Sequence, residues 1–188
     1  MDGRIDGETY GNGLTNDRVY SKSTGRLLVA AVGLAPANGI QYLNYSYDAI
    51  GNVLSRADGP TGRTETFVYD ALDRLTSSMV AGAGGPGTID VSYYANGNIH
   101  TKSDVGTYAY SGINAGPHAV TGVSGGPLGT QTYAYDANGN MTSGGGRVIT
   151  WTSFNQAKTI AGTGGHSSAF YFGAAHERVK QVSDTATT

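Results

Sequence analysis

Tyr135-Asp136-Ala137-Asn138-Gly139-Asn140-Met141-Thr142-Ser143 is one of four related nine-residue segments in this chain, and their repetition decides the fold. The other three begin at Tyr47 (YDAIGNVLS), Tyr69 (YDALDRLTS) and Tyr93 (YYANGNIHT). The starting tyrosines are 22, 24 and 42 residues apart, and 42 is close to two steps of 21. A fixed period of about 20–50 residues is typical of stacked supersecondary units. The sequence therefore predicts a repeat protein that builds a surface or wall, and not a single catalytic pocket.

Each copy has the composition of a β-hairpin. Tyr45 and Tyr47 alternate with serine, so they lie on one face of a strand that ends at the turn. An aspartate directly after such a strand accepts hydrogen bonds from turn N–H groups, and Gly or Asn tolerates the positive φ of a tight turn. Asn96-Gly97 and Asn138-Gly139 are strong hairpin signals in the later copies. The second copy lacks this glycine, and Asp73 is expected to take the left-handed position there.

The residues expected to build the turns recur at equivalent positions in the copies. They are Tyr47, Asp48, Gly51, Asn52, Tyr69, Asp70, Tyr93, Gly97, Tyr135, Asp136, Gly139 and Asn140. The aspartate recurs at the same position of three copies, which is expected of a residue that caps a turn. A pair of catalytic carboxylates would more often occur once in a chain. We therefore predict a structural role for these residues, and we predict no catalytic residue.

Weaker copies extend the repeat through most of the chain. They lie at Tyr20-Ser21, Tyr108–Ser111, Phe154–Ala157 and Ala169–Gly173, the last read as a final strand and turn. The helix signal is limited to one turn at most, at Ala174–Arg178. Residues 1–188 are therefore predicted to form a single repeat region, with repeats from about residue 10 to residue 181 and no separate catalytic domain.

The predicted fold class is all-β, with repetitive antiparallel β-hairpins that form a curved, open segment of a β-shell or spiral. About 14–18 short strands fit the length. Repeat arrays need polar capping units at their ends, and neither end of the sequence has one, since Asp184–Thr188 is a plain polar tail. Unpaired sheet edges accept further strands. The chain is therefore expected to be a segment of a longer array or a truncated product.

Composition excludes several classes of protein. The net charge is −2, and only 14% of the residues are charged, so there is no basic surface for nucleic acid. The 30 glycines and 13 tyrosines fit tight turns between short strands. The absence of cysteine excludes disulfides and cysteine-ligated metals. The N-terminus lacks a signal-peptide pattern, and the longest apolar run, Leu27–Ala35, is too short to span a bilayer.

The sequence offers little support for a metal site or a cofactor. Asp136, Asn138 and Asn140 have the spacing of the first three calcium ligands, but Met141 and Arg147 stand where a calcium loop needs Gly and Glu. The histidines are scattered, at His100, His118, His166 and His176, and no zinc motif, phosphate loop or nucleophile–base pair is present. We predict no metal and no cofactor, and we expect His118 to order its loop by a hydrogen bond to its own backbone.

Tyrosine is the remaining candidate for a binding role. The strand tyrosines are expected to form aromatic ladders across neighbouring strands, with Trp151 anchoring one layer of that packing. Exposed aromatic rings also stack on sugars, and Tyr108 and Tyr171 are the candidate ligand-binding residues. The alternative function is thus a carbohydrate- or cell-surface-binding repeat module.

The tyrosine–aspartate segments resemble the YD-repeat (Rhs) family. That family includes bacterial Rhs-type polymorphic toxins, the shell subunits of insecticidal toxin complexes and the β-shell of teneurins. The Tyr-Asp motif of the family is matched by Tyr47-Asp48, Tyr69-Asp70 and Tyr135-Asp136. The phrases Tyr10–Thr15, Gly116–Thr121 and Phe172–Gln181 are similar to its bacterial branch.

The resemblance implies a long β-ribbon wound into a hollow shell that encloses a toxic C-terminal domain. Bacterial members carry an autoproteolytic aspartate near a D-P-x-G motif, but this chain has no Asp-Pro dipeptide and nothing like a core or effector after Gln181. It is expected to be a non-enzymatic wall segment, secreted or held at the cell surface through a specialised secretion system. Its expected partners are the remainder of a larger shell and a cargo or effector domain, with cell-surface glycans as a further candidate, and neither nucleic acid nor a membrane span is expected.

Overall fold

A computed structural model describes residues 4–33 and 39–184. The tail at 185–188, and residues 34 and 35 of the apolar run, lie outside the described residues. The described chain consists of strands, turns and loops, and no helix in it is long and apolar enough to cross a membrane. The strands pair in chain order, β1 to β12 in a 12-stranded sheet and β13 to β18 in a 6-stranded sheet.

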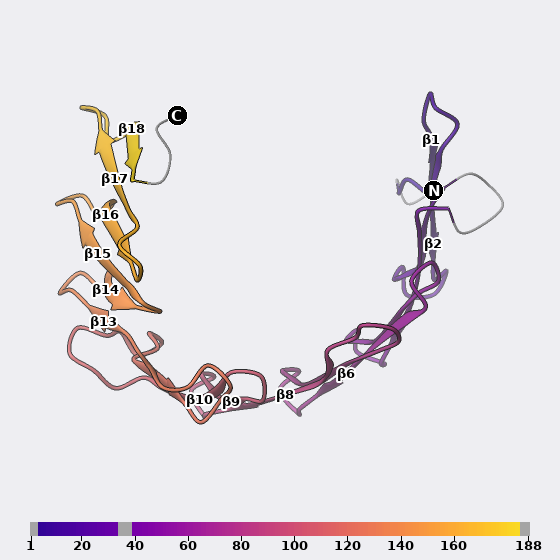
Figure 1. Cartoon of the computed structure of the whole chain (residues 1–188). Coiled ribbons are helices and arrows are strands. Elements are labelled where there is room, and N and C mark those ends of the chain that lie inside the picture. The colour runs from indigo at the N-terminus through magenta and orange to yellow at the C-terminus, as the bar shows by residue number, and fades with distance from the viewer. Residues whose placement is uncertain (1–3, 34–38, 185–188) are drawn as a thin grey trace. The chain divides into compact units, whose positions relative to one another are not determined.

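The chain divides into two compact units, Met1–Val91 and Ser92–Thr188. The first unit holds one continuous antiparallel meander, in which each strand pairs with the strand before it (Figure 1). Its strands are β1 (Gly7–Thr9), β2 (Thr15–Tyr20), β3 (Leu27–Gly33), β4 (Gln41–Tyr47), β5 (Val53–Asp58), β6 (Arg63–Tyr69), β7 (Leu75–Ala81) and β8 (Gly87–Tyr93), the last of which ends inside the second unit.

The second unit continues the antiparallel order with shorter strands before Tyr135 and longer strands after it. Its strands are β9 (Ile99–Lys102), β10 (Gly106–Ala109), β11 (Gly122–Ser124), β12 (Gln131–Thr132), β13 (Ala134–Tyr135), β14 (Met141–Gly144), β15 (Arg147–Trp151), β16 (Ala157–Gly162), β17 (Ser167–Phe172) and β18 (Arg178–Ser183).

The predicted all-β class, the antiparallel hairpins and the open sheet are confirmed. The strand count lies at the upper end of the expected range, and in the described residues neither sheet closes into a barrel. One local prediction was wrong. The strand at Ala169–Gly173 is not the last, because β18 follows and pairs with β17. The weak helix signal at Ala174–Arg178 corresponds to a turn over residues 174–176, and Arg178 begins β18. His176 has a φ of 64°, which a right-handed helix does not allow.

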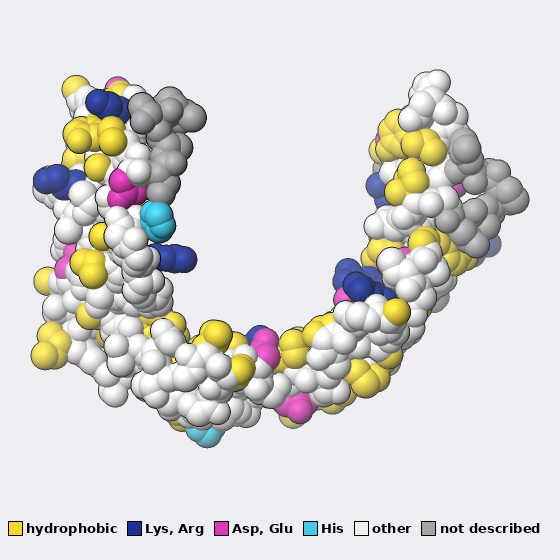
Figure 2. All heavy atoms as spheres, viewed as in Figure 1, with side chains coloured by type: hydrophobic (Ala, Val, Ile, Leu, Met, Phe, Trp, Pro, Cys, Tyr) yellow, Lys and Arg dark blue, Asp and Glu magenta, His cyan; other side chains and the backbone are white. Residues whose placement is uncertain are grey.

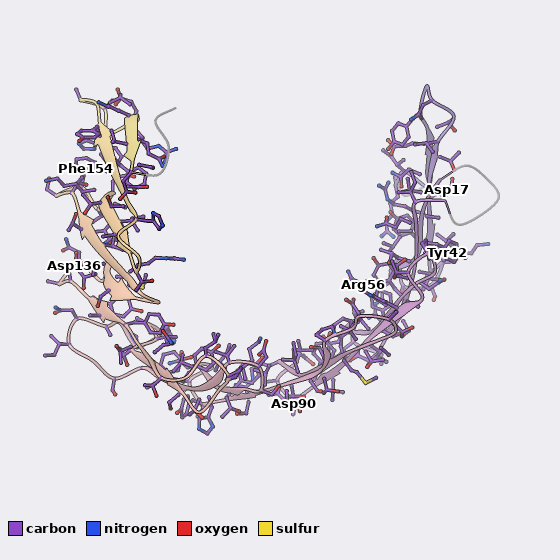
Figure 3. All side chains as sticks on the ribbon, in the orientation of Figure 1. Asp17, Tyr42, Arg56, Asp90, Asp136 and Phe154 are labelled. Atoms are coloured by element: carbon purple, nitrogen blue, oxygen red, sulfur yellow. The ribbon has the colours of Figure 1, made fainter. Side chains whose placement is uncertain are left out.

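Within each unit the protein is a single layer of sheet with very little core. Val123 and Ile149 are the buried apolar side chains of the described residues, and Asn98 is the buried polar one. Large apolar side chains stand open instead, among them Ile50 and Leu72, each 70% exposed. Figure 3 shows side chains projecting from both faces of the strands, and Figure 2 shows apolar side chains on the surface of both units. The described residues therefore do not cover the faces of their own sheets.

Candidate functional site

The repeated turns share one backbone frame. In each, the first residue donates its N–H to the carbonyl four residues later, at 2.8–3.0 Å, and the fourth residue has a positive φ. The frames begin at Tyr10, Asp48, Asp70, Tyr94, Asp136, Thr152 and Gly173. The left-handed residues are Gly13, Gly51, Asp73, Gly97, Gly139, Asn155 and His176. This pattern fits a type I turn closed by a left-handed bulge residue. Asp73 takes the left-handed position, as its sequence position predicted.

In three of these turns the first residue is an aspartate, whose carboxylate accepts hydrogen bonds from residues of the same turn. Asp48 Oδ1 accepts the N–H groups of Ile50, Gly51 and Asn52 at 2.7–3.0 Å. Its Oδ2 accepts Asn52 Nδ2 at 3.0 Å. These bonds use N–H groups that the turn cannot pair through the ladder, which is the role of an Asx turn.

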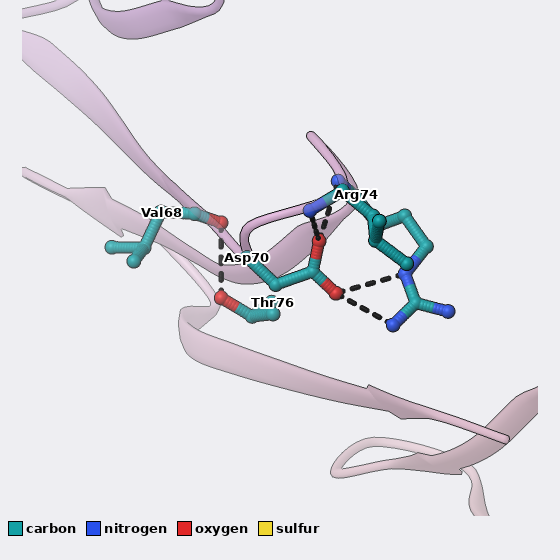
Figure 4. A network of polar contacts seen from close by, with 5 residues as sticks. Val68, Asp70, Arg74 and Thr76 are labelled. Atoms are coloured by element: carbon teal, nitrogen blue, oxygen red, sulfur yellow. Dashed lines mark hydrogen bonds and ion pairs between the residues drawn. The ribbon is translucent and has the colours of Figure 1, made fainter. Parts of the chain in front are cut away.

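The other two aspartates bind their turns in the same way. Asp136 Oδ1 accepts N–H from Asn138 and Asn140 at 2.9 Å each, and Oδ2 accepts Asn140 Nδ2 at 3.1 Å. Asp70 Oδ2 meets the Arg74 guanidinium instead, with Nε at 2.8 Å and the second nitrogen at 2.7 Å (Figure 4). The fifth residue of the frame thus completes the carboxylate contacts whether it is Asn or Arg.

These contacts lower the pKa of the three carboxyl groups. The side-chain bond from Arg74 leads at Asp70, and the side-chain bond from Asn140 leads at Asp136, so both pKa values fall. At Asp48 desolvation pushes the pKa up, but the N–H groups of Gly51 and Asn52 outweigh it and the pKa is also lowered. The turns therefore favour the ionised aspartate.

Acid is expected to loosen the turns. A folded-state pKa below the unfolded value gives stability that is present at higher pH and is lost as the pH falls through the folded pKa. The urea midpoint of the chain should therefore fall as the pH drops from about 5 to about 2. The triple variant Asp48→Asn, Asp70→Asn, Asp136→Asn should have a lower urea midpoint than the wild type at about pH 5. Its midpoint should also change less between about pH 5 and about pH 2. An unchanged pH dependence in the triple variant would contradict this role.

Aromatic side chains connect strands at five places. A hydroxyl or indole N–H at or just after the end of one strand donates to a carbonyl at or near the start of an earlier strand, at 2.7–2.9 Å. The pairs are Tyr47 to Leu27, Tyr69 to Val53, Tyr110 to Ile99, Tyr135 to Val120 and Trp151 to Met141. We call these contacts aromatic clips.

The aromatic clips occur where the backbone ladder has already ended. The β5–β6 ladder stops at Ser55↔Thr66, yet Tyr69 reaches the carbonyl of Val53 beyond that end. A clip thus satisfies a carbonyl that the neighbouring strand no longer reaches. Burial is the main cause that raises the pKa of the Tyr47, Tyr110 and Tyr135 hydroxyls, so these groups keep the proton that they donate.

Removing one clip hydroxyl is expected to cost about 1 kcal/mol, the usual net value of a single hydrogen bond. Tyr135→Phe deletes the bond to the Val120 carbonyl and leaves the ring in place. Urea unfolding followed by circular dichroism measures the change. The matched control is Tyr171→Phe, because no described residue accepts a hydrogen bond from the Tyr171 hydroxyl. Equal stability of the two variants would show that the clip contributes nothing.

The fifth residue of one turn also reaches the next turn along the chain. Asn52 Nδ2 donates to Asp73 Oδ1 at 3.0 Å, and Asn140 Nδ2 donates to Asn155 Oδ1 at 2.9 Å. Asp73 and Asn155 occupy the left-handed position of their turns. A non-glycine residue at that position therefore supplies a side-chain acceptor that joins successive repeats.

Two more turn-ending residues reach forward in this way. Arg26 donates to the Asp48 carbonyl at 2.6 Å, and Asn98 Nδ2 donates to the Pro117 carbonyl at 2.8 Å. His118 Nδ1 lies 2.6 Å from Asn98 Oδ1. The prediction that His118 bonds its own backbone was thus wrong, because a buried asparagine from the preceding repeat offers a closer partner. The sequence reasoning did not single out Asn98, although it occupies the same position as Asn52 and Asn140.

The structure separates the two tyrosines predicted as ligand-binding residues. Tyr108 lies on β10 and lines one groove together with Tyr94 and Tyr110. Tyr171 lies on β17, is 51% exposed and has the Lys180 ammonium 5.5 Å from its ring centre.

Of the predicted cross-strand ladders, the described residues contain isolated ring pairs, such as Tyr94–Tyr110 with ring centres 6.2 Å apart. Tyr45 and Tyr47 also stack, with ring centres 6.5 Å apart, but they lie on one strand. Tyr93 ends β8 and is half-buried. In the described residues no three His, Asp or Glu side chains are placed to hold a metal ion.

Comparison with known proteins gives a family match for one part of the chain. Residues 37–86, which contain the turns at Asp48 and Asp70, match the family described as RHS Repeat. The match covers this part of the chain alone. The resemblance to the YD-repeat (Rhs) family is thereby confirmed. A search of curated proteins found no match.

The chain also has a fold similar to that of known toxin-complex structures. A crystal structure of TcdB2-TccC3 aligns with a TM-score of 0.62 at 15% identity, over 96% of this chain and 11% of that chain. The Photorhabdus luminescens Tc holotoxin pore aligns with the same TM-score and identity, over 95% of this chain and 10% of that chain. TcdB2-TccC3 without its hypervariable C-terminal region aligns with a TM-score of 0.56 at 16% identity, over 96% and 11%. The chain thus spans about a tenth of the length of the structures it matches.

Proposed function

We propose that this chain is a non-enzymatic wall segment of an Rhs-type shell. In this proposal the repeat region from about residue 10 to residue 181 acts as one array, and the shell encloses or presents a toxin or effector domain in bacterial competition or host interaction. Its partners are the remainder of the shell and that cargo domain. The sequence resemblance, the RHS repeats and the fold shared with toxin-complex structures support this function.

The single-layer architecture is the observation that carries the proposal. A self-contained domain of this length would bury about two thirds of the surface that its unfolded chain exposes. Here Val123 and Ile149 are the buried apolar residues of the described chain, and the largest apolar side chains stand exposed. A sheet with this exposure is suited to a wall that further protein covers.

The wall function is mechanical. The Asp turns fix the bend at one side of each hairpin, and the aromatic clips hold the strands where the ladder ends. The hydrogen bonds from Asn52 and Asn140 connect one turn to the next, so neighbouring repeats resist separation together. None of these side chains is left free for chemistry, since each is engaged in the turn or in the link.

The test is the size and protection of the native protein. An antibody raised against the 188-residue chain is used to detect the protein in lysates of the source cells, before and after limited proteolysis. A wall segment predicts a band much larger than the 19.4 kDa of this chain, and co-purification of a domain that resists protease until the shell is unfolded. A stable, free protein of 19.4 kDa without associated protein would refute the proposal.

A further inference from the structure

A groove on the six-stranded sheet combines an apolar floor with a single arginine. It measures about 360 Å³ and lies at the end of the sheet where β16 and β18 begin and β17 ends. Its lining residues are Gln156, Ala157, Ile160, Phe170, Phe172 and Arg178, all in the second unit. Small-molecule sites usually occupy about 300–1,000 Å³ and are mostly apolar, with a few polar groups that fix the ligand. The groove has the size and the composition of such a site.

A β-bulge brings the arginine to the apolar face of the sheet. Tyr171 of β17 pairs with Lys180 of β18. Phe172 then pairs with Arg178, which leaves one extra residue on β18. Strict alternation would place Arg178 on the same face as Lys180. The extra residue reverses this, since a bulge re-aims the side chain that follows it, and Arg178 joins the face of the phenylalanines.

Arg178 and Lys180 accordingly contact aromatic rings on opposite faces of β17. The Arg178 guanidinium carbon lies 5.6 Å from the Phe170 ring centre. The Lys180 ammonium lies 5.5 Å from the ring centre of Tyr171, the next residue along β17. Successive residues of a strand point to opposite faces, so these two cations belong to different surfaces. Of the lysines and arginines in the described chain, Arg178 alone lines the groove.

The charge of Arg178 is not balanced by any carboxylate of the described residues, because none of them forms an ion pair with it. Its neighbour Glu177 points back into the preceding turn, where Oε2 accepts the N–H of Ala175 at 3.0 Å. The N–H donors of a guanidinium lie in its own plane, so a guanidinium that stacks on a ring keeps them for another partner. Arg178 therefore offers a forked set of donors at the edge of an apolar surface.

The apolar floor is held in place by contacts outside the groove. The Phe172 ring meets the Phe154 ring edge to face, with ring centres 5.4 Å apart. The ring of Phe154, which is labelled in Figure 3, stacks in turn on the His176 ring at 3.9 Å, with the two planes 4° apart. Phe170 and Phe172 are half-buried. A preformed surface of this kind loses little entropy on binding.

We propose that this groove binds a small apolar carboxylate, with its carboxylate on the Arg178 guanidinium and its apolar body against Phe170 and Phe172. Guanidinium and carboxylate match in charge and in their paired hydrogen-bond geometry. The lining residues include no second cation to neutralise a doubly charged phosphate, and no acidic residue to hold a cation. The inference goes beyond the wall function and does not rest on it.

The test is titration of the intact 188-residue chain with phenylpropionate and with its uncharged amide, phenylpropionamide, followed by the amide chemical shifts in NMR. Phenylpropionate is expected to shift the signals of Phe170, Phe172 and Arg178. The amide should bind about tenfold more weakly, because it lacks the charge that strengthens a hydrogen bond to the guanidinium.

Two variants that lose the same charge provide the matched comparison. Arg178→Gln should weaken the binding of phenylpropionate about tenfold, since it removes the forked donor. Lys180→Gln should retain the wild-type affinity, because Lys180 lies on the other face of the sheet. Circular dichroism spectra identical to wild type exclude misfolding. The comparison of acid and amide uses the wild type, so it decides the proposal even if Arg178→Gln fails to fold.

Four results would overturn the site. The first is a failure of phenylpropionate to bind, and the second is equal affinity for the acid and the amide. The third is an equal loss in Arg178→Gln and Lys180→Gln, which would mean attraction by net charge alone. The fourth is binding of acetyl-Gly-Gly-Phe through its free terminal carboxylate, with no binding of phenylpropionate, which would assign the groove to the end of a polypeptide.

Discussion

Replacing Ile149 by alanine is expected to lower the free energy of unfolding by about 2–4 kcal/mol. Ile149 lies on β15, is 9% exposed and pairs with Ile160 of β16 across the sheet. Few other apolar side chains of the described residues are as buried, so no neighbouring core can close over the lost methyl groups. The site sits in the same strand as Trp151, the single tryptophan, whose fluorescence reports unfolding of that sheet.

The adjacent residue provides the matched control. Val148 is 59% exposed and points to the other side of the same strand, so Val148→Ala should change stability by no more than about 0.5 kcal/mol. Urea unfolding of both variants under the same conditions gives the comparison. If the two substitutions cost the same, Ile149 does not nucleate a local core, and the sheet is held by its hydrogen bonds alone.

The repeat spacing was sufficient to predict the strand order and the turns. A strand that ends in Tyr, followed by Asp and a Gly or Asn, has few alternatives to a hairpin, so local propensity and the tertiary fold agree. The position of Asp73 could also be predicted, because the fourth residue of the turn needs a positive φ whether or not it is glycine. The strands and turns depend on residues that are close in sequence, so they could be predicted from the sequence alone.

The contacts between repeats were not predictable in the same way. The clip from Tyr69 to the Val53 carbonyl depends on where the β5–β6 ladder stops, and this is a matter of twist that no single segment encodes. The bridge from Asn52 to Asp73 joins residues 21 apart. A comparison of fifth positions across the copies was the available signal, since Asn52, Asn98 and Asn140 share that position.

The candidate ligand residues show the limit of composition. Tyr108 and Tyr171 look alike as isolated strand tyrosines, and only the arrangement of neighbours separates a groove from an open strand. The groove lined by Tyr94, Tyr108 and Tyr110 lies where the repeat has no turn of the shared frame, and a missing element leaves no motif to recognise. The 42-residue spacing between Tyr93 and Tyr135 indicated an irregular repeat, but it did not indicate a groove there.

A tight packing contact in the second unit also escaped sequence reasoning. Gly144 ends β14, and the chain turns on Gly145 and Gly146, whose φ values are 58° and 72°. Gly144 is buried beneath the Tyr133 ring, and a Cβ there would collide with that ring. Gly144 is therefore required for ring packing and for its own backbone conformation, at a φ of 156°, and the two glycines that follow it are required for the turn.

Gly144→Ala is accordingly expected to destabilise the chain by about 1–3 kcal/mol, as forced overpacking does. Gly116→Ala is the control, because no atom lies within 4 Å of a Cβ built there, and its cost should stay within about 0.5 kcal/mol. Adding Tyr133→Ala to Gly144→Ala removes the colliding ring. The double variant should then be more stable than the sum of the two single losses predicts, by an interaction energy of about 0.5–3 kcal/mol. Strict additivity would mean that Gly144 is needed for its backbone conformation and not for the ring, because only the ring contact couples the two positions.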